Sequence, residues 1–365
     1  MKILYITTIG TTMNFFTRYI QSLLKEGHTV DIATNENASK VADCYREWGC
    51  KVYSISCTRS PLNKGTFKAI KEIRAIVKDG GYELVHCHTP IAAMCTRLAC
   101  KKLRKSGVKV IYTAHGFHFY KGAPKKNWML FYTIEKLCAR HTDVLITINR
   151  EDYALAQKKM KAKRIAYVPG VGIDLEKFSQ PSVTREDKRR ELGIPDSSTL
   201  LLSVGELNQN KNHETVIRAI ANMENVRYLI AGKGGLDGYL QGLIDELGMT
   251  DRVQLLGYRS DIRELLIASD VFVFPSYREG LSVSVMEAMA SGLSVVCSRI
   301  RGNTDLVDEK GGAHFNPHSV EDCRNAIESV LSADMSEHGK YNKEKIKAFS
   351  CETVDKLMRE IYSLK

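Results

Sequence analysis

Two glutamates stand eight positions apart in the segment FPSYREGLSVSVMEAMASGLSVV (274–296). Glu279 lies in the loop after a predicted strand, and Glu287 lies more than one turn inside the helix predicted next. Ser282 is a suitable N-cap for that helix, and Gly292 ends it. Because carboxylates only accept hydrogen bonds, the two acids suit different parts of one hydroxyl-rich ligand, such as a ribose and a hexose. A capped surface helix with two solvated acids explains the spacing equally well.

Three strand ends carry groups that could hold a phosphorylated ligand. Gly280 lets a ligand approach the backbone closely, and the free N–H groups at the helix start after it favour an anion. In SVGELNQNKNH (203–213), Lys211 can meet a phosphate as a point charge. In GYRSD (257–261), backbone groups and a side-chain plane are available to a base. The last two signals are weak alone and gain meaning only in combination with the first.

Length and composition indicate a soluble protein of two domains. The chain has 365 residues, of which 44% are hydrophobic and 26% charged. No apolar run approaches the roughly 18–20 residues that span a bilayer. The start, MKILYITTIG, resembles a signal peptide, but its apolar run is short and no small-residue cleavage site follows. It is interpreted as a first strand.

The ten cysteines contain no CxxC pair, and most lie in apolar strand or helix patterns. This indicates reduced, packed thiols in a cytosolic compartment. The HCH segment (86–88) could suggest a metal site, but a buried strand end is the favoured interpretation.

The positive charge is concentrated in the first half of the chain. Residues 1–180 hold 30 Lys and Arg against 14 Asp and Glu, whereas residues 181–365 hold 23 against 28. The first half is therefore expected to face an anionic partner: a nucleic acid, a membrane surface or a phosphorylated substrate. Solubility alone is the simpler explanation.

Apolar strands alternate with amphipathic helices throughout, which predicts parallel sheets covered on both faces. Strands are expected at 2–7, 29–34, 51–55, 83–88, 109–115, 144–149 and 165–170, and again at 199–205, 226–232, 253–258, 271–276 and 293–298. The fold class is thus α/β, with two doubly wound Rossmann-like domains at 1–180 and 181–349. The last segment, 350–365, is predicted to be helical, and we expect it to pack back on the first domain. A ligand is expected at the carboxyl ends of the strands, in the cleft between the domains.

The combined motifs resemble the retaining glycosyltransferases of family 4, which have the GT-B fold. The resemblance covers nearly the whole chain, and its specific element is Glu279 with Glu287, followed by Gly292 and LSVV. It implies a nucleotide-sugar donor in the C-terminal domain and an acceptor in the N-terminal one. The pairing of GELNQNKNH with TAHGFHFYKGAP (113–124) is similar to the branch that builds bacterial exopolysaccharide and capsule repeat units.

The resemblance assigns roles to individual residues. Glu279 would contact the donor sugar, Glu287 the ribose, Lys211 the diphosphate, and the backbone of Gly280, Leu281 and Ser282 the sugar and its phosphate. Tyr258 and Arg259 would border the base, and Gly205 and Glu206 belong to the phosphate strand. In the N-terminal half, His115 would lie near the transferred sugar, with a structural strand-end histidine as the alternative. Gly10 and Thr11 are nearest to the family's donor-loop glycines.

One departure from the family pattern affects the diphosphate. Glu206 stands where the family usually has an arginine, and an acid there repels a diphosphate. Lys211, the helix N-terminus or another basic residue must then neutralise more of the charge of the diphosphate. Ser282 and Ser294 replace common prolines, and Asp305 replaces a common glutamate, which indicates a subfamily.

The acceptor side is expected at a membrane. Members of this branch commonly use an acceptor on a polyprenyl diphosphate at the inner face of the cytoplasmic membrane. Basic clusters at 101–109, 121–128 and 158–164 support this, and Trp128, Met129, Phe131 and Tyr132 border the second. The aromatic residues could instead pack in the core. Nucleic acid is a weaker candidate partner, because no nucleic-acid module is recognised.

The sequence therefore predicts a cytoplasmic, peripherally membrane-associated glycosyltransferase that moves a hexose or N-acetylhexosamine from a UDP-sugar to a lipid-linked glycan. No DxD-like metal site is apparent, so activity is expected to need neither metal nor other cofactor. A UDP-sugar 2-epimerase of GT-B fold and a non-catalytic membrane-docked subunit of a glycan assembly complex are the alternatives. The donor sugar, the linkage, the acceptor and the oligomeric state stay open.

Overall fold

The computed structural model describes residues 1–61, 63–179 and 182–363. It forms two compact units, one of Met1–Val171 with Asp355–Lys365 and one of Gly172–Val354. The boundary predicted between residues 180 and 181 falls outside the described residues. The C-terminal helix, α17 (Cys351–Tyr362), enters the first unit at Asp355.

The first unit is built on a parallel seven-stranded sheet with the order β3-β2-β1-β4-β5-β6-β7. Its inner strands are almost wholly buried, which explains why they appear in the sequence as continuous apolar runs. The strands are β1 (Lys2–Ile9), β2 (Thr29–Asn35), β3 (Val52–Ser54), β4 (Leu84–His88), β5 (Lys109–Ala114), β6 (Val144–Thr147) and β7 (Arg164–Tyr167).

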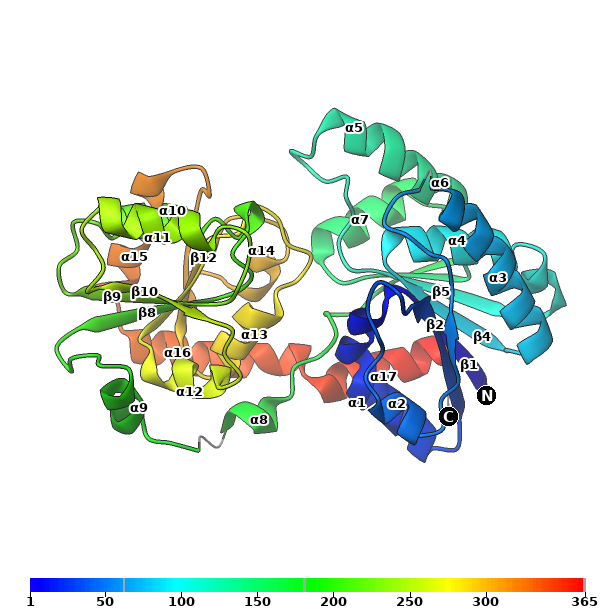
Figure 1. Cartoon of the computed structure of the whole chain (residues 1–365), viewed down its shortest axis with the longest axis horizontal. Helices are drawn as coiled ribbons and strands as arrows, with labels where there is room; N and C mark the ends of the chain where they lie inside the picture. The colour runs from blue at the N-terminus through cyan, green and yellow to red at the C-terminus, as the bar shows by residue number, and fades with distance from the viewer. Residues whose placement is uncertain (62, 180–181, 364–365) are drawn as a thin grey trace. The chain divides into compact units, whose positions relative to one another are not determined.

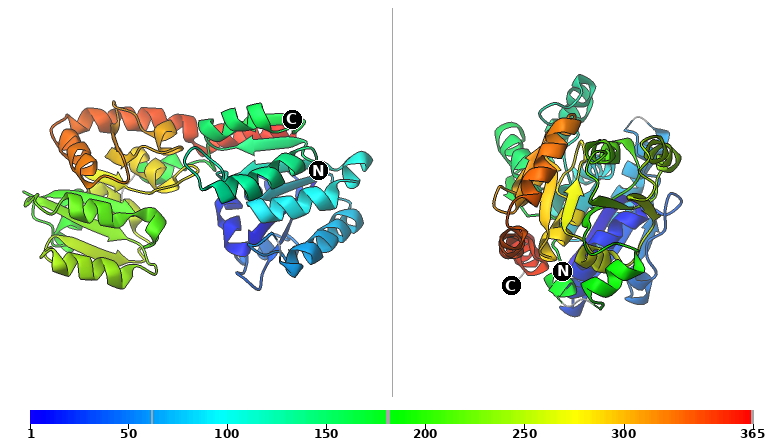
Figure 2. Two further views of the ribbon diagram at one scale, coloured as in Figure 1. Left: turned by 90° about the horizontal axis from the view of Figure 1, so that it is seen from above. Right: turned by 90° about the vertical axis from the view of Figure 1, so that its left-hand side faces the viewer.

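Helices cover both faces of this sheet (Figure 2). Leu4 and Ile6 of β1 face the core shared with α3 and α4, whereas Tyr5 faces Phe16 and Tyr362 of α17. The helices are α1 (Thr17–Lys25), α2 (Cys44–Glu47), α3 (Lys64–Gly80), α4 (Pro90–Cys100), α5 (Lys125–Asn127), α6 (Thr133–Ala139) and α7 (Arg150–Lys159). The unit also holds two 3-10 helices, η1 (Gly10–Phe16) and η2 (Leu103–Ser106), and the π-helical η3 (Trp128–Tyr132).

The second unit repeats the plan with a parallel six-stranded sheet in the order β10-β9-β8-β11-β12-β13 (Figure 1). The strands are β8 (Thr199–Val204), β9 (Val226–Ala231), β10 (Val253–Gly257), β11 (Val271–Phe274), β12 (Ser294–Ser298) and β13 (Gly312–Phe315). The sequence prediction missed β13. That strand, GAHF, has four residues and only one large apolar side chain, Phe315, so its pattern does not stand out.

Alternate residues of β8 point into two separate cores. Leu200 and Leu202 pack against α12 and α13, whereas Leu201 packs against α10, α11 and α15. The helices of this unit are α8 (Leu175–Ser179), α9 (Arg185–Glu191), α10 (His213–Ala219), α11 (Asp237–Glu246), α12 (Ile262–Ala268), α13 (Val283–Ala290), α14 (Asn303–Leu306), α15 (Val320–Leu331) and α16 (Met335–Lys345). Shorter turns are η4 (Gln209–Lys211) and η5 (Ile346–Phe349).

The two parallel sheets confirm the predicted α/β fold class. All ten cysteines are free thiols, and nine of them are buried, as the apolar patterns around them predict. Within the described part of the chain, no helix is both long enough and apolar enough to span a bilayer.

Candidate functional site

In the second unit, the loop after β8 is tied to the loop after β11. The N–H of Tyr277 donates to the carbonyl of Asn210 at 2.8 Å, and the Asn210 amide donates to the carbonyl of Arg278 at 3.0 Å. The Asn212 amide donates to the carbonyls of Pro275 and Pro317 at 3.1 and 2.9 Å. These bonds fix the two loops at the carboxyl edge of the sheet, where ligands of such sheets bind.

This connection brings together two residues that the sequence predicts to contact the donor. Lys211 Nζ lies 2.8 Å from Glu279 Oε1, and both side chains are less than one-fifth exposed. The ammonium also lies 4.6 Å from the centre of the Phe274 ring. Lys211 is therefore held in one place by a carboxylate and an aromatic face.

Glycines let the surrounding loops approach closely. A Cβ atom on Gly205 would lie 3.2 Å from Lys211 Cε, so the predicted phosphate-strand glycine borders the lysine directly. A Cβ on Gly302 would lie 2.3 Å from the carbonyl oxygen of Gly280. The segment after β12 thus packs on the predicted sugar and phosphate loop.

Arg301 is a residue of this site that the sequence analysis missed. It is buried, and its Nε donates to the carbonyl of Glu279 at 3.1 Å. The segment RGN at the end of a strand was the available signal, since an arginine beside a glycine at a strand end can reach a neighbouring loop.

The helix after the loop has the cap that the sequence predicts. Ser282 Oγ accepts from the N–H of Val285 at 3.3 Å, and Gly292 has a φ of 80° after the end of α13. Glu287 lies in the second turn of this helix and is half-buried. Burial raises the pKa of its carboxyl, and the positive charge of Lys177 opposes that rise.

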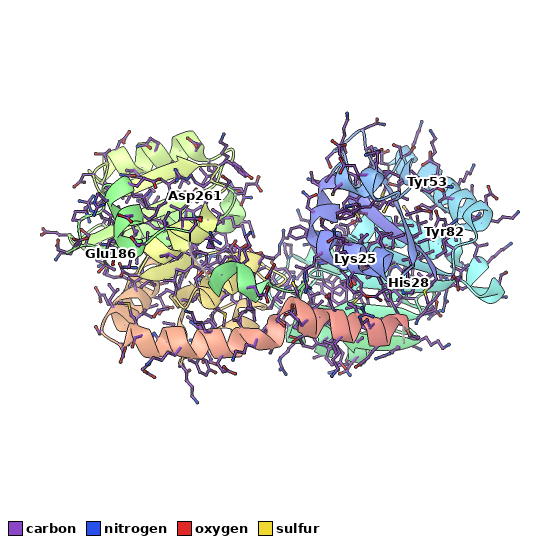
Figure 3. The ribbon with its side chains drawn as sticks, turned by 90° about the horizontal axis from the view of Figure 1, so that it is seen from below. Lys25, His28, Tyr53, Tyr82, Glu186 and Asp261 are labelled. Carbon is purple, nitrogen blue, oxygen red and sulfur yellow. The ribbon has the colours of Figure 1, made fainter. Side chains whose placement is uncertain are left out.

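The predicted base-contacting residues lie at the end of β10. Tyr258 is 76% exposed. Arg259 forms a two-point pair with Asp261, at 2.7 and 2.5 Å, and Asp261 is labelled in Figure 3. The Arg259 guanidinium lowers the pKa of the Asp261 carboxyl. Among the bonds of the described residues, none joins Tyr258 or Arg259 to Lys211 or Glu279. Glu206 is exposed to solvent.

In the first unit, His115 follows β5 and contacts a second histidine. His115 Nε2 lies 3.1 Å from Nδ1 of His88, the last residue of β4. Burial lowers the pKa of His115 to about 4 and holds that of His88 well below its ordinary value. Both rings are therefore neutral at pH 7, and His115 can accept or donate one hydrogen bond.

A chain of buried polar groups lies beside this pair, and sequence reasoning did not find it. The hydroxyls of Tyr5 and Tyr362 are 2.7 Å apart, and the Tyr362 hydroxyl is 2.6 Å from His86 Nδ1. His86 Nε2 lies 2.8 Å from Thr113 Oγ1. The predicted buried strand end at 86–88 is confirmed, because every residue of β4 is buried.

Gly10 and Thr11 open the short helix after β1. The N–H of Gly10 donates to the carbonyl of Ser39, and a Cβ on Gly10 would lie 2.4 Å from that oxygen. The N–H of Thr11 donates to Ser39 Oγ at 3.1 Å. The same short helix ends at Phe16, whose ring lies 4.1 Å from His88 and 5.9 Å from His115.

Among the described residues, no three His, Cys, Asp or Glu side chains gather in a group that could hold a metal ion. Activity without a metal stays a prediction.

Comparison with known proteins identifies the family. Residues 184–348 match the family model described as glycosyl transferases group 1, and residues 2–149 match the model described as glycosyl transferase 4-like. EpsD of Bacillus subtilis (strain 168), which carries a glycosyltransferase name, is 37% identical over 261 residues, or 70% of this chain and 68% of EpsD. The UDP-Gal:alpha-D-GlcNAc-diphosphoundecaprenol alpha-1,3-galactosyltransferase of Escherichia coli is 31% identical over 72% of this chain and 70% of its own length.

Solved structures show the same fold. A sucrose-phosphate synthase from Thermosynechococcus elongatus superposes with a TM-score of 0.80 at 21% identity, covering 100% of this chain and 98% of that one. Anabaena HepE in complex with UDP superposes with a TM-score of 0.79 at 18% identity, covering all of both chains. These matches confirm the predicted GT-B fold, and the sequence matches confirm the predicted exopolysaccharide-type branch.

Proposed function

The chain belongs to the group 1 glycosyltransferases, and we propose that it moves a hexose or N-acetylhexosamine from a UDP-sugar to a glycan on a polyprenyl diphosphate. The reaction would serve exopolysaccharide, capsule or O-antigen-type synthesis and retain the anomeric configuration. The observation that carries this proposal is the Lys211–Glu279 pair, held beside the loop of Gly280 at a sheet's carboxyl edge.

The site suits electrostatic catalysis. Transfer breaks the bond from the sugar's C1 to the diphosphate, forms a bond from C1 to an acceptor hydroxyl oxygen and passes the hydroxyl proton to an oxygen of the departing diphosphate. The electron pair leaves with UDP, so cationic and N–H groups near the diphosphate lower the barrier. Lys211 and the amides of Gly280, Leu281 and Ser282 would supply them, while Glu279 would hold the sugar and Glu287 the ribose.

The donor and acceptor classes have support from one relative. The Escherichia coli enzyme is named for a UDP-galactose donor and a diphosphoundecaprenol-linked acceptor, and its identity to this chain is 31%. A UDP-sugar and a lipid-linked glycan are therefore the proposed substrates, with the specific sugars unassigned.

A membrane surface is the proposed location of the acceptor. Met129 is 77% exposed and Leu137 57% exposed, and Lys125 and Lys126 precede them in α5, which projects from the first unit (Figure 1). Lysines attract anionic lipid headgroups, and the apolar side chains can enter the interface. This combination supports the proposed reversible docking at the inner face of the cytoplasmic membrane.

Turnover with defined substrates tests the proposal. The purified protein is incubated with a panel of UDP-sugars and a membrane lipid extract, with and without a chelator. We expect UDP release and sugar incorporation into lipid only when both substrates are present. The rates should be equal with and without the chelator. Interconversion of UDP-sugars without an acceptor would instead indicate an epimerase, and loss of turnover in chelator would overturn metal independence.

A further inference from the structure

A pocket of about 590 Å³ lies in the second unit, where the ends of α10 and α11 meet the loop after β11. This volume is within the range of about 300–1,000 Å³ that is typical of small-ligand sites. The residues that matter for its chemistry are Asn208, Gln209, Asn210, Glu214, Tyr239 and Tyr277. The described residues that line it include none of those predicted to hold the donor.

Amide side chains supply both donors and acceptors at its wall. Asn208 uses its carbonyl oxygen to accept from the N–H of Lys211, so its NH₂ group is available. Asn210 uses its NH₂ group toward Arg278, so its carbonyl oxygen is available. Gln209 is exposed beside them. Since a sugar hydroxyl both donates and accepts, a wall of this kind matches hydroxyl groups.

Two tyrosine rings add apolar faces. Tyr239 is 50% exposed, and its hydroxyl donates to Glu214 Oε2 at 2.9 Å. Tyr277 is 36% exposed, and its ring stacks on His318 at 4.8 Å, which supports the ring from one side. Such rings pack well against the C–H faces of a pyranose while their hydroxyls stay polar.

The charge of the lining selects a neutral ligand. Neither lysine nor arginine occurs among the described lining residues, and these are the groups that bind phosphate or carboxylate. The Glu214 carboxylate is already paired with Arg218 Nε at 2.8 Å and with Tyr239. Burial lowers the pKa of His213 to about 4, so that ring is neutral at pH 7.

The pocket is also held in shape before any ligand arrives. Its two loops are the ones joined by the Tyr277–Asn210 and Asn210–Arg278 hydrogen bonds. Asn212 fixes the start of α10 with bonds to Pro275 and Pro317. A preformed wall reduces the entropy lost when a weakly binding ligand is ordered.

We propose that this pocket binds a neutral saccharide, at a sugar site separate from the predicted donor site. Hydroxyl groups would bond to the amides of Asn208, Gln209 and Asn210, and a pyranose face would pack on Tyr277. This inference does not depend on the proposed donor, because the pocket uses different side chains.

Saturation-transfer NMR on the full chain tests the site with three probes: lactose, cellobiose and N,N′-diacetylchitobiose. We expect saturation transfer to at least one disaccharide with millimolar affinity, unchanged when UDP is saturating. Tyr277→Ala and Gln209→Ala should each weaken binding by roughly tenfold. Tyr277→Phe, which keeps the ring, should retain most of it.

The matched control is Phe67→Ala, which removes an aromatic ring that is 61% exposed in α3. It should bind the disaccharide like wild type, and all variants should unfold at similar temperatures. No transfer to any of the three probes, displacement of the probe by UDP, or wild-type binding by Tyr277→Ala would each overturn the proposal. Calorimetry of UDP binding to wild type tests the donor assignment by itself, so a failure of the saccharide proposal can be told from a failure of that assignment.

Discussion

Lys211 Nζ and Glu279 Oε1 are 2.8 Å apart, although the two residues are 68 positions apart in the sequence. The pair joins the loop after β8 to the loop after β11, and the ring centre of Phe274, the last residue of β11, lies 4.6 Å from the ammonium. Before a donor arrives, the charge of the lysine is therefore balanced by the acid. If Lys211 meets the diphosphate and Glu279 the sugar, as predicted, the diphosphate has to share Lys211 with Glu279, and one ion pair then connects the two contacts.

Glu279→Gln should separate these two contacts. The substitution removes the charge that competes with the diphosphate, so UDP affinity should stay equal or increase. Turnover should fall roughly 10²-fold, because an oriented group near the reacting sugar is lost. Calorimetry with UDP and initial rates with the active UDP-sugar measure the two effects. Glu309→Gln, at an exposed acid of the same unit, is the control and should change neither.

Glu287→Ala should weaken binding of the nucleotide. If its carboxylate holds the ribose hydroxyls, UDP affinity should fall by about tenfold, the loss expected for charge-assisted hydrogen bonds of about 1.5 kcal/mol. The Kd of uridine should rise by the same factor, because the contact between Glu287 and the ribose does not involve the phosphates. Equal binding of UDP by wild type and variant would contradict the assignment.

Glu287→Gln should also make the protein more stable at neutral pH. Burial raises the pKa of this carboxyl above the unfolded value of 4.5, so ionisation costs stability in the folded state. This cost is absent below pH 4.5 and appears as pH rises through the folded pKa. The variant should therefore unfold at a higher temperature than wild type at pH 7, and the difference should shrink toward pH 4.5. A lower melting temperature for the variant at pH 7 would contradict this.

The sequence predicted the elements whose signals are local. Ser282 and Gly292 carry the chemistry of a helix start and a helix end, and the buried strands appear as apolar runs. Contacts between distant segments left no such signal. The bond from Arg301 to the carbonyl of Glu279 and that from Tyr362 to His86 depend on how strands are ordered in the sheet. Periodicity along one segment does not contain that order.

The aromatic segment after the second basic cluster divides into two roles that the sequence could not separate. Trp128 and Tyr132 pack on Phe119, with ring centres 5.6 and 5.4 Å away, whereas Met129 is 77% exposed. A π-helical turn over Trp128–Tyr132 rotates consecutive residues to different sides. Trp128, Phe131 and Tyr132 are partly buried and pack against the core of the first unit, so the alternative of packing on the core holds for these three aromatic residues.

Met129→Glu should weaken binding to vesicles of phosphatidylglycerol and phosphatidylcholine by roughly tenfold, because an apolar side chain is lost from the interface and a repelling charge is added. Trp128→Ala should instead lower the melting temperature, since it leaves a gap in the core. Vesicle co-sedimentation and thermal unfolding measure the two outcomes. Phe67→Glu, which places the same charge on α3, controls for net charge. Equal vesicle binding by Met129→Glu and wild type would remove this surface as the docking site.

The histidine cluster of the first unit should make stability fall on mild acidification. Burial lowers the pKa of His86 to about 3 and of His115 to about 4, against an ordinary value of 6.5. Near pH 6.5 these histidines therefore bind protons in the unfolded chain but not in the folded chain. Stability is lost as pH falls from 6.5 toward the lowered pKa values. Each such histidine contributes a slope of about 1.4 kcal/mol per pH unit. His115→Gln should reduce the slope of the urea-unfolding free energy between pH 6 and 5, in roughly that amount, while Glu309→Gln keeps it. A wild-type free energy that is flat across this interval would show that the rings are protonated in the folded protein.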